Sequence, residues 1–96
     1  MDDVELDPAA HSVSRSDQRV DLTPREFALL EYLMRHEGEV VSRGQILEHV
    51  WNYDYGGSSN VVDVYVAYLR KKLEVPFARP FVVTVRGVGY TVGSAG

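Results

Sequence analysis

The sequence contains no cysteine, which excludes disulfide bonds and thiolate metal sites. It also lacks any apolar run near the ~18 residues that a membrane-spanning helix needs. The amino terminus, Met1-Asp2-Asp3, is acidic and does not have the basic start of a secretion signal. These absences predict a cytoplasmic domain without a membrane-spanning segment.

Residue patterns that carry catalysis or cofactor binding are missing as well. His11, His36 and His49 are isolated from one another, and no pair of them has the spacing of a zinc site. Gly87 and Gly89 are too few and wrongly placed to cradle a phosphate. We therefore expect no catalytic residues, no metal and no cofactor, and hence a protein that is not an enzyme.

The composition is that of one ordinary globular domain spanning residues 1–96, with 45% hydrophobic and 25% charged residues. The formal net charge of −4 argues mildly against a nucleic-acid partner. The charge is unevenly placed, however. Residues 1–59 hold five basic and twelve acidic residues, a balance of −7, whereas residues 60–96 hold five basic and two acidic residues, a balance of +3. This separation leaves nucleic-acid binding open.

Residues 1–22 alternate short apolar stretches with turn residues. Asp7-Pro8 follows the first stretch, and Ser16-Asp17 precedes the last one. Such pieces predict small antiparallel strands.

Two helix starts follow in close succession. Thr23 and Glu26 form a capping-box pair with Pro24 at the first helical position, and Ser42 and Gln45 form a second capping-box pair. Each start precedes apolar residues at helical spacing, which we expect to be buried: Phe27, Leu30, Leu33 and Met34 in the first helix, and Ile46, Leu47, Val50 and Trp51 in the second.

A third helix is predicted to begin near Asn60 and to complete a three-helix core over residues 23–74. Several β-branched residues favour a strand here, but the helical spacing of the apolar residues outweighs them. One face is expected to be buried and carries Val62, Val66, Leu69 and Leu73. The opposite face carries Val61, Val64, Tyr65, Tyr68, Lys71 and Lys72.

The chain closes with a strand, a tight turn and a second strand over residues 81–92, followed by a tail at 93–96. The glycines near Arg86 are expected to form the turn. The fold class is therefore α+β: a small N-terminal antiparallel sheet, three helices and a C-terminal β-hairpin, which are the parts of a winged helix-turn-helix. In that architecture the third helix enters the major groove and the hairpin, or wing, contacts the backbone or minor groove.

Two interpretations of the outer face of the third helix remain open at this point. Apolar side chains there can contact thymine methyl groups, Tyr65 and Tyr68 can bond a phosphate or a base edge, and Arg70-Lys71-Lys72 can neutralise phosphates. Alternatively, the helix is buried on two sides and its cationic end merely suits the helix dipole. Arg86 beside a glycine-built turn favours the first interpretation, because such a tip can reach a narrow minor groove.

Specific stretches between about residues 20 and 92 resemble the effector domain of the OmpR/PhoB family of response regulators. They are Leu22-Thr23-Pro24-Arg25-Glu26-Phe27-Ala28-Leu29-Leu30, Val41-Ser42-Arg43, Val50-Trp51, Asn60-Val61-Val62-Asp63-Val64-Tyr65-Val66, Tyr68-Leu69-Arg70-Lys71-Lys72-Leu73 and Thr84-Val85-Arg86-Gly87-Val88-Gly89-Tyr90. The resemblance implies a four-stranded amino-terminal sheet and sequence-specific binding of double-stranded DNA.

The resemblance also implies a set of contact residues. Base contacts are expected from Asn60, Val61, Val64, Tyr65 and Tyr68. Phosphate contacts are expected from Arg43, Trp51, Arg70, Lys71 and Tyr90, and wing contacts from Thr84 and Arg86. Lys72 joins the phosphate set from its charge and helix position alone. Ala67 and Tyr68 stand where some relatives carry two basic residues, so we expect this domain to neutralise fewer phosphates, with a salt slope shallower by ~0.9 for each phosphate not neutralised.

The partners that the resemblance implies extend beyond these residues. They are tandem DNA half-sites occupied by two domains head to tail, with a monomer off DNA and a dimer on it. RNA polymerase is implied for the loop from Asn52 to Ser59, and an N-terminal receiver domain and a sensor histidine kinase for the full system. The receiver is absent from these 96 residues, which suggests a carboxyl-terminal fragment of a longer chain. The alternatives are a winged-helix protein-interaction module, which would show no salt-dependent affinity for DNA, and the output domain of a regulator without a receiver.

Overall fold

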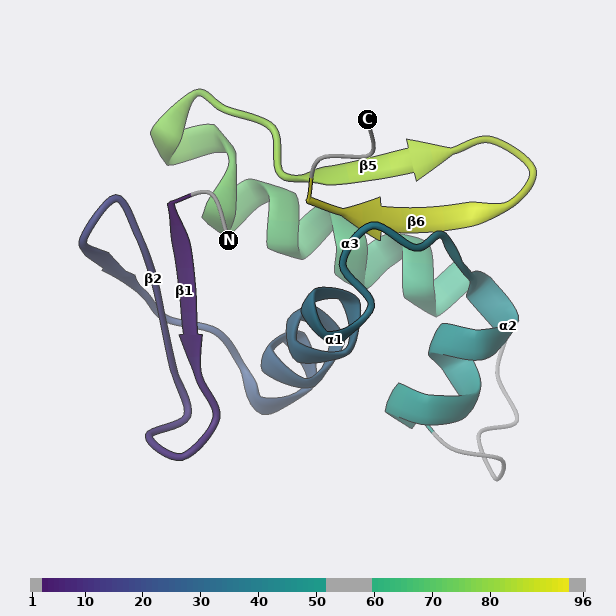
Figure 1. Ribbon diagram of the computed structural model, residues 1–96, viewed down its shortest axis with the longest axis horizontal. Coiled ribbons are helices and arrows are strands. Elements are labelled where there is room, and N and C mark those ends of the chain that lie inside the picture. Colours follow the sequence, from purple (N-terminus) through teal and green to yellow (C-terminus); the bar gives the residue numbers. More distant parts are fainter. Residues whose placement is uncertain (1–2, 52–59, 94–96) are drawn as a thin grey trace.

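The computed structural model describes residues 3–51 and 60–93 (Figure 1). Helix α1 lies between the N-terminal sheet and α2, and it packs against α3 and β6. The elements follow in the order β1 (Val4–Asp7), β2 (Ser12–Arg15), β3 (Gln18–Val20), α1 (Pro24–Arg35), β4 (Val41–Ser42), α2 (Arg43–Ile46), the π-helical turn η1 (Leu47–Trp51), α3 (Asn60–Leu73), the 3₁₀ turn η2 (Val75–Phe77), β5 (Val82–Val85) and β6 (Gly89–Val92).

The first three strands form an antiparallel sheet in the order β1-β2-β3, which confirms the predicted amino-terminal sheet. Ser16 and Asp17 connect β2 to β3 with φ angles of 50° and 64°, the left-handed pair that a two-residue hairpin turn requires. Within the described residues this sheet has three strands rather than the four that the resemblance implied. After β3 the chain passes through Leu22 directly to the cap of α1.

Both predicted capping boxes are present. The Thr23 hydroxyl accepts the Glu26 amide at 3.3 Å, and the Glu26 carboxylate accepts the Thr23 amide at 2.9 Å. Ser42 and Gln45 repeat the arrangement at 3.1 and 2.8 Å. The second helix differs from the prediction in its later part, because α2 makes one turn and then widens into η1. The spacing of apolar residues in the sequence does not distinguish an α-helical turn from a π-helical one.

The core confirms the predicted buried face of α3, since Val62, Val66, Leu69 and Leu73 are all buried. Helix α1 contributes Leu29 as well as the predicted Phe27, Leu30 and Leu33. Met34, Leu47 and Val50 were also predicted to be buried and are only partly buried. The complete apolar core is Val4, Val13, Phe27, Leu29, Leu30, Leu33, Val41, Ile46, Trp51, Val62, Val66, Leu69, Leu73, Phe81, Val82, Tyr90 and Val92.

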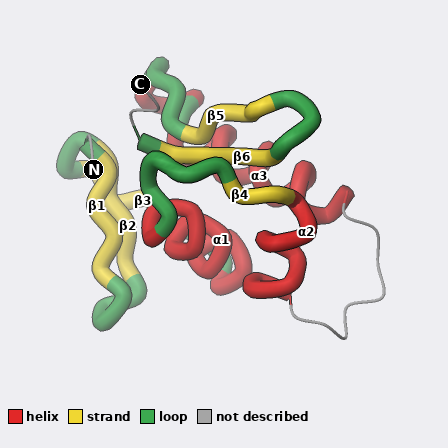
Figure 2. Tube along the Cα trace, turned by 45° about the vertical axis from the view of Figure 1, so that its right-hand side comes forward, coloured by secondary structure: helices red, strands yellow, loops and turns green. Residues whose placement is uncertain are grey.

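The C-terminal sheet has three strands in the order β4-β6-β5, where the sequence predicted only a two-stranded hairpin (Figure 2). The added strand pairs Val41 with Tyr90 and Ser42 with Gly89. A Cβ atom at Gly89 would lie 1.9 Å from the Val41 carbonyl oxygen, so glycine is required there for close strand approach. The expectation that Gly89 forms the turn is therefore wrong. Gly87, at φ +75°, supplies the left-handed conformation at the tip.

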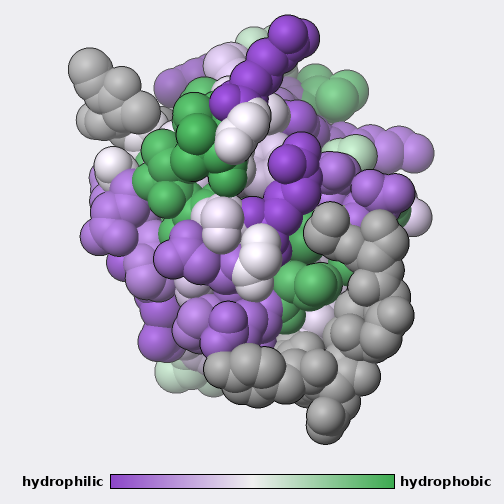
Figure 3. All heavy atoms as spheres, turned by 90° about the vertical axis from the view of Figure 1, so that its right-hand side faces the viewer, coloured by the Kyte–Doolittle hydropathy of each residue, from purple (hydrophilic) through white to green (hydrophobic). Residues whose placement is uncertain are grey.

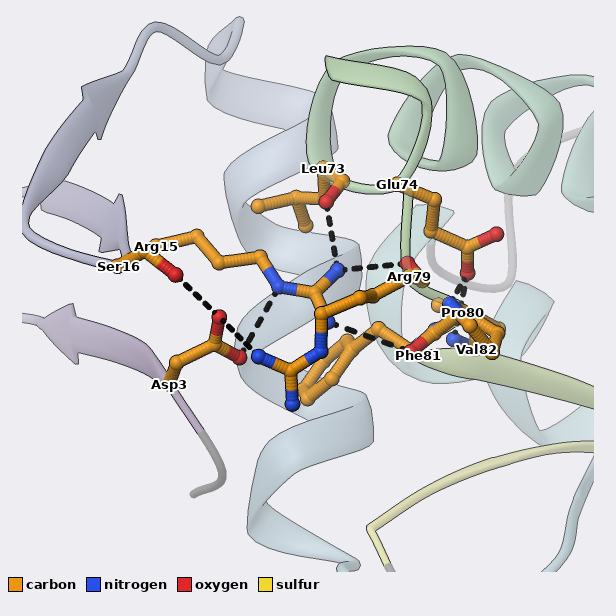
Figure 4. A network of polar contacts seen from close by, with 9 residues as sticks. All are labelled: Asp3, Arg15, Ser16, Leu73, Glu74, Arg79, Pro80, Phe81 and Val82. Carbon is orange, nitrogen blue, oxygen red and sulfur yellow. Dashed lines mark hydrogen bonds and ion pairs between the residues drawn. The ribbon is translucent and has the colours of Figure 1, made fainter. Parts of the chain in front are cut away.

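A buried arginine joins the N-terminal sheet to the end of α3 (Figure 4). The Arg15 side chain is fully buried, and its guanidinium donates to the carbonyls of Leu73 at 2.7 Å, Arg79 at 2.9 Å and Pro80 at 3.3 Å. It also pairs with Asp3 at 3.0 Å. A hydrogen bond from Ser16 and the nearby Arg15 together outweigh burial and lower the pKa of Asp3.

The same network fixes the chain between α3 and β5. The Asp3 carboxylate also pairs with Arg79 at 3.1 Å. The Glu74 carboxylate accepts the amides of Phe81 and Val82, both at 2.8 Å. These bonds satisfy backbone groups that lack a helix or sheet partner, and so they set where the wing leaves α3.

Candidate nucleic-acid interface

The outer face of α3 is open to solvent over its middle. Val64 is 43% exposed and Tyr68 is 45% exposed. Asn60, Ala67 and Lys71 are exposed as well, whereas Val61 and Tyr65 are half-buried at the edge of the face. The helix is therefore not buried on two sides, and the second interpretation of its sequence is wrong.

An aromatic ladder runs onto this face from η1, and we define it as Trp51, Tyr65 and Tyr68. The Trp51 ring, only 6% exposed, meets the Tyr65 ring edge-on with 5.2 Å between centroids. The Tyr65 ring in turn meets Tyr68 at 5.3 Å, also edge-on. Edge-to-face contacts of this kind are favourable for aromatic rings. Tyr65 and Tyr68, which are both predicted to read bases, are thus packed against each other, and Tyr65 is also packed against the buried Trp51.

Arg43, Asp63 and Tyr90 form a polar cluster where α2, α3 and β6 meet. The Asp63 carboxylate accepts a hydrogen bond from the Arg43 guanidinium at 2.8 Å and another from the Tyr90 hydroxyl. Burial opposes ionisation of Asp63, but these two bonds prevail and lower the pKa of its carboxyl. Burial and the same carboxylate raise the pKa of Tyr90. Tyr90 is only 4% exposed, whereas Arg43 is half-buried and its guanidinium lies at the rim.

Arg70 ties α3 to the wing. Its guanidinium donates to the Val82 carbonyl at 3.0 Å and to the Thr84 hydroxyl at 2.6 Å. Two of the predicted contact residues, Arg70 and Thr84, are thereby brought together, and each is half-buried or exposed at the surface. These bonds fix the wing relative to α3.

The two adjacent lysines of α3 have different surroundings. The Lys72 ammonium pairs with the Glu26 carboxylate at 2.6 Å, and Glu26 is only 3% exposed. Burial opposes ionisation of Glu26, but the bonds from Lys72 and Thr23 prevail and lower its pKa. Lys71 is exposed and makes no ion pair with a described residue. The structure therefore neutralises the charge of Lys72, the one contact residue that rested on charge and position alone.

The tip of the wing carries Arg86, Gly87 and Val88, all exposed. Arg86 likewise has no ion-pair partner among residues 3–51 and 60–93. Seen from the end of the molecule that carries α2 and this tip, the surface is mainly hydrophilic with separate hydrophobic patches (Figure 3). The loop from Asn52 to Ser59, predicted to contact RNA polymerase, lies outside the described residues.

Sequence reasoning missed Arg25 as a neighbour of this site. Its guanidinium lies 5.4 Å from the centre of the Trp51 ring and donates to the Val50 carbonyl. Only three-dimensional proximity reveals this contact, because Arg25 and Trp51 are far apart in sequence.

None of the described helices is long and apolar enough to cross a membrane, and the described residues include no cluster of three or more side chains suited to hold a metal ion.

The chain is similar to regulators of transcription. Residues 17–92 match the family described as "Transcriptional regulatory protein, C terminal". The transcriptional regulatory protein YkoG of Bacillus subtilis, itself uncharacterized, is 48% identical over 95% of this chain and 40% of its own length. The response regulator MprA of Mycobacterium avium is 46% identical over 94% of this chain and 40% of its own length. This chain thus spans about 40% of the length of these relatives.

A solved structure shows the same fold bound to DNA. The Klebsiella pneumoniae RstA DNA-binding domain, in complex with the RstA box, aligns with a TM-score of 0.83 and 30% identity. The alignment covers 95% of this chain and 91% of that one. The match over residues 17–92, with the three-helix core and the β5–β6 wing, shows that this chain belongs to the transcriptional regulatory protein C-terminal family, the OmpR/PhoB-type winged-helix DNA-binding domains of response regulators.

Proposed function

We propose that this domain binds double-stranded DNA sequence-specifically, with α3 in the major groove and the β5–β6 wing on the adjacent backbone or minor groove. The observation that carries the proposal is the division of α3 into two faces. Val62, Val66, Leu69 and Leu73 are buried, whereas Val64 and Tyr68 are more than 40% exposed. A surface helix normally places polar residues outward, so an exposed valine and tyrosine suit contact with base edges and thymine methyl groups.

The proposed contacts differ in how freely their side chains can reach DNA. Base contacts come from Asn60, Val61, Val64, Tyr65 and Tyr68. Phosphate contacts come first from Lys71 and Arg86, whose charges are unpaired among the described residues. Arg43, Arg70 and Thr84 lie at the surface but already hold internal partners. Trp51 and Tyr90 are mostly buried and offer only an edge, and Lys72 is omitted because it pairs with Glu26.

This division predicts the salt dependence of binding. Each neutralised phosphate lowers the slope of log K against log salt by about 0.9, so Lys71 and Arg86 alone give a slope of about −2, and Arg43 and Arg70 extend it to about −4. A protein-interaction module with the same fold would show no such dependence. The family's regulators bind DNA, which favours the DNA proposal over that alternative.

The wider setting is also part of the proposal. The domain is the output part of a cytoplasmic two-component response regulator, joined to an N-terminal receiver that a sensor histidine kinase phosphorylates. Two copies, monomeric in isolation, occupy tandem half-sites head to tail. The response-regulator relatives, which are longer than this chain, support the receiver. The domain is not an enzyme on this proposal, because its family acts in transcription.

The test is selection of bound sequences from a random duplex pool, followed by mobility shifts on single-base variants of the selected site. Tyr65→Ala should change preference at one base pair, where a well-placed contact gives ~1–3 kcal/mol of discrimination. Arg86→Ala should weaken binding to all variants alike, and Arg35→Ala, on the exposed end of α1, serves as the control for removal of a positive charge. Absence of any selected sequence, or a uniform loss from Tyr65→Ala, would contradict the proposal.

A further inference from the structure

We infer that Arg25 is a positioning residue for base recognition: it holds Trp51, and through Trp51 it fixes the orientation of Tyr65 on the outer face of α3. This inference rests on the proposed function, because it concerns how the proposed base-reading face is kept in one conformation. Arg25 lies in the first turn of α1, and α1 supplies none of the proposed base contacts.

Arg25 holds η1 in two ways at once. Its guanidinium donates to the Val50 carbonyl and lies over the neighbouring Trp51 ring, 5.4 Å from the centroid. The last carbonyls of a helical turn lack a partner within the turn, so this bond satisfies a group at the end of η1. A planar guanidinium above an indole face is favourable. Together the two contacts fix both the backbone and the ring of η1's last two residues.

The constraint passes from Trp51 to α3. The Trp51 ring meets Tyr65 at 5.2 Å with an interplanar angle of 80°, and Tyr65 meets Tyr68 at 5.3 Å with an angle of 66°. A tyrosine ring turns about only two side-chain bonds, so the edge-on contact with the buried Trp51 restricts the orientation of Tyr65. Moving Trp51 therefore moves the surface that Tyr65 and Tyr68 present together.

The Tyr65 ring borders open space on the side of α1. An open hollow of about 520 Å³ lies between the start of α1 and α3. It is lined by Thr23, Pro24, Arg25, Ala28 and Tyr65. Removal of the Arg25 side chain would enlarge the hollow and remove the guanidinium that lies over the Trp51 ring. The Tyr65 ring would then have room to turn away from the outer face of α3. Arg25 thus excludes alternative orientations of Tyr65 as well as stabilising the observed one.

Arg25 would act differently if it bound a phosphate or served only as a packing residue. Removal of a phosphate-binding cation makes the salt slope shallower by about 0.9 and weakens all sequences alike. Loss of packing lowers the melting temperature without altering relative base preference. Removal of a positioning residue alters base preference while the salt slope stays the same. These three signatures separate the roles.

The experiment compares Arg25→Ala and Arg25→Lys with Arg35→Ala as the matched control. Arg35 lies on the same helix, is exposed and pairs only with Glu31 among the described residues, so its substitution removes the same charge away from the ladder. Trp51 is the only tryptophan in the chain, which makes its fluorescence emission a direct probe of the Arg25 contact. Near-ultraviolet circular dichroism reports on aromatic packing in the whole chain, so the difference between Tyr65→Phe and Tyr68→Phe variants and the unsubstituted domain identifies the contribution of these two rings.

Arg25→Ala should shift the Trp51 emission and weaken the aromatic dichroism in the free protein. It should also reduce discrimination at the base pair read by Tyr65 about fivefold to tenfold, much of what one base contact provides, with the salt slope unchanged. Arg25→Lys should restore part of the discrimination, since it keeps the cation but not the planar guanidinium with its several donors. Arg35→Ala should leave emission and base preference unchanged.

Three outcomes would overturn the inference: an Arg25→Ala emission spectrum equal to that of the unsubstituted domain, a retained base preference, or a shallower salt slope with uniform loss. An unsubstituted domain that selects no sequence overturns the proposed function along with this inference. A domain that selects a sequence, and whose Arg25→Ala variant keeps the same preference, overturns this inference alone.

Discussion

Arg15 and Arg86 carry the same charged group in opposite surroundings. Arg15 ends strand β2 of the N-terminal sheet, and Arg86 follows β5 at the tip of the wing. The Arg15 guanidinium is fully buried and donates to three carbonyls around the end of α3, while it pairs with Asp3 (Figure 4). Arg86 stands at the tip of the wing, exposed and without an ion pair to a described residue. One arginine holds the fold together, and the other is free for a partner.

The comparison extends to every basic residue of the carboxyl-terminal part, whose positive charge first suggested a nucleic-acid partner. Within residues 60–96, Arg70 bonds to the wing, Lys72 pairs with Glu26 and Arg79 pairs with Asp3. Lys71 and Arg86 have no ion-pair partner among the described residues. A count of charges along the sequence therefore overstates the charge available to DNA, because it cannot show which cations already hold partners inside the domain.

Removal of the buried arginine should give the largest effect. Arg15→Ala leaves the carbonyls of Leu73, Arg79 and Pro80 without their donor and opens a cavity in the core. The free energy of unfolding should fall by roughly 3–5 kcal/mol, the usual cost of breaking a buried charged network. Urea denaturation followed by circular dichroism measures it.

Arg19→Ala provides the control for this prediction. Arg19 lies on the neighbouring strand, and its side chain is 75% exposed beside Asp21. Its removal should change the unfolding free energy by less than about 0.5 kcal/mol. Equal stability of the two variants would mean that the Arg15 network does not hold the N-terminal sheet to α3.

The sequence was sufficient to predict local elements wherever the signal is local. The capping boxes at Thr23 and Ser42 depend on residues three positions apart, and the buried face of α3 depends on a regular apolar spacing. The strand β4 was missed because two residues carry no periodicity and its pairing with β6 joins residues far apart in sequence. Gly89 was misassigned for the same reason, since the atom that excludes a side chain belongs to Val41.

The features of the candidate site likewise divide into those set by local sequence and those set by contacts between distant residues. The exposure of Val64 and Tyr68 follows from helical periodicity once the buried face is known. The internal partners of Arg43, Arg70 and Lys72, and the contact of Arg25 with Trp51, arise from tertiary packing. No spacing of residues in the sequence indicates these contacts. The sequence therefore predicted which residue types lie at the interface better than it predicted which of their side chains are free to contact DNA.

Lys71 and Lys72 are neighbours in the sequence, and only Lys72 has an ion-pair partner among the described residues, so together they test whether an internal partner removes a cation from DNA binding. Lys72→Ala should cost about 1 kcal/mol of unfolding free energy, because Glu26 loses its partner but Lys72 is partly exposed and water compensates in part. It should leave the salt slope of DNA binding unchanged. Lys71→Ala should leave stability within about 0.5 kcal/mol and make the slope shallower by about 0.9. Denaturation measures the unfolding free energy of each variant, and DNA-binding titrations at several salt concentrations measure its salt slope. Equal salt slopes for the two variants would count against the assignment of Lys71, and not Lys72, to the phosphate contacts.

Acid should also lower the free energy of unfolding, because it protonates the internal Glu26 carboxylate. The pKa of Glu26 is lowered below its ordinary 4.5, because its bonds to Lys72 and Thr23 outweigh burial. A folded-state pKa below the unfolded one contributes stability above the unfolded value and loses it as the pH falls through the folded value. The unfolding free energy should therefore be level near pH 6 and decline below about pH 4.5, with Glu26 contributing a slope of at most about 1.4 kcal/mol per pH unit. Glu26→Gln keeps an acceptor for the Thr23 amide but does not titrate, so its curve should be flatter over that interval. Parallel acid curves for the two proteins would show that the Lys72–Glu26 pair is not linked to folding, and Lys72 would then return to the set of cations available to DNA.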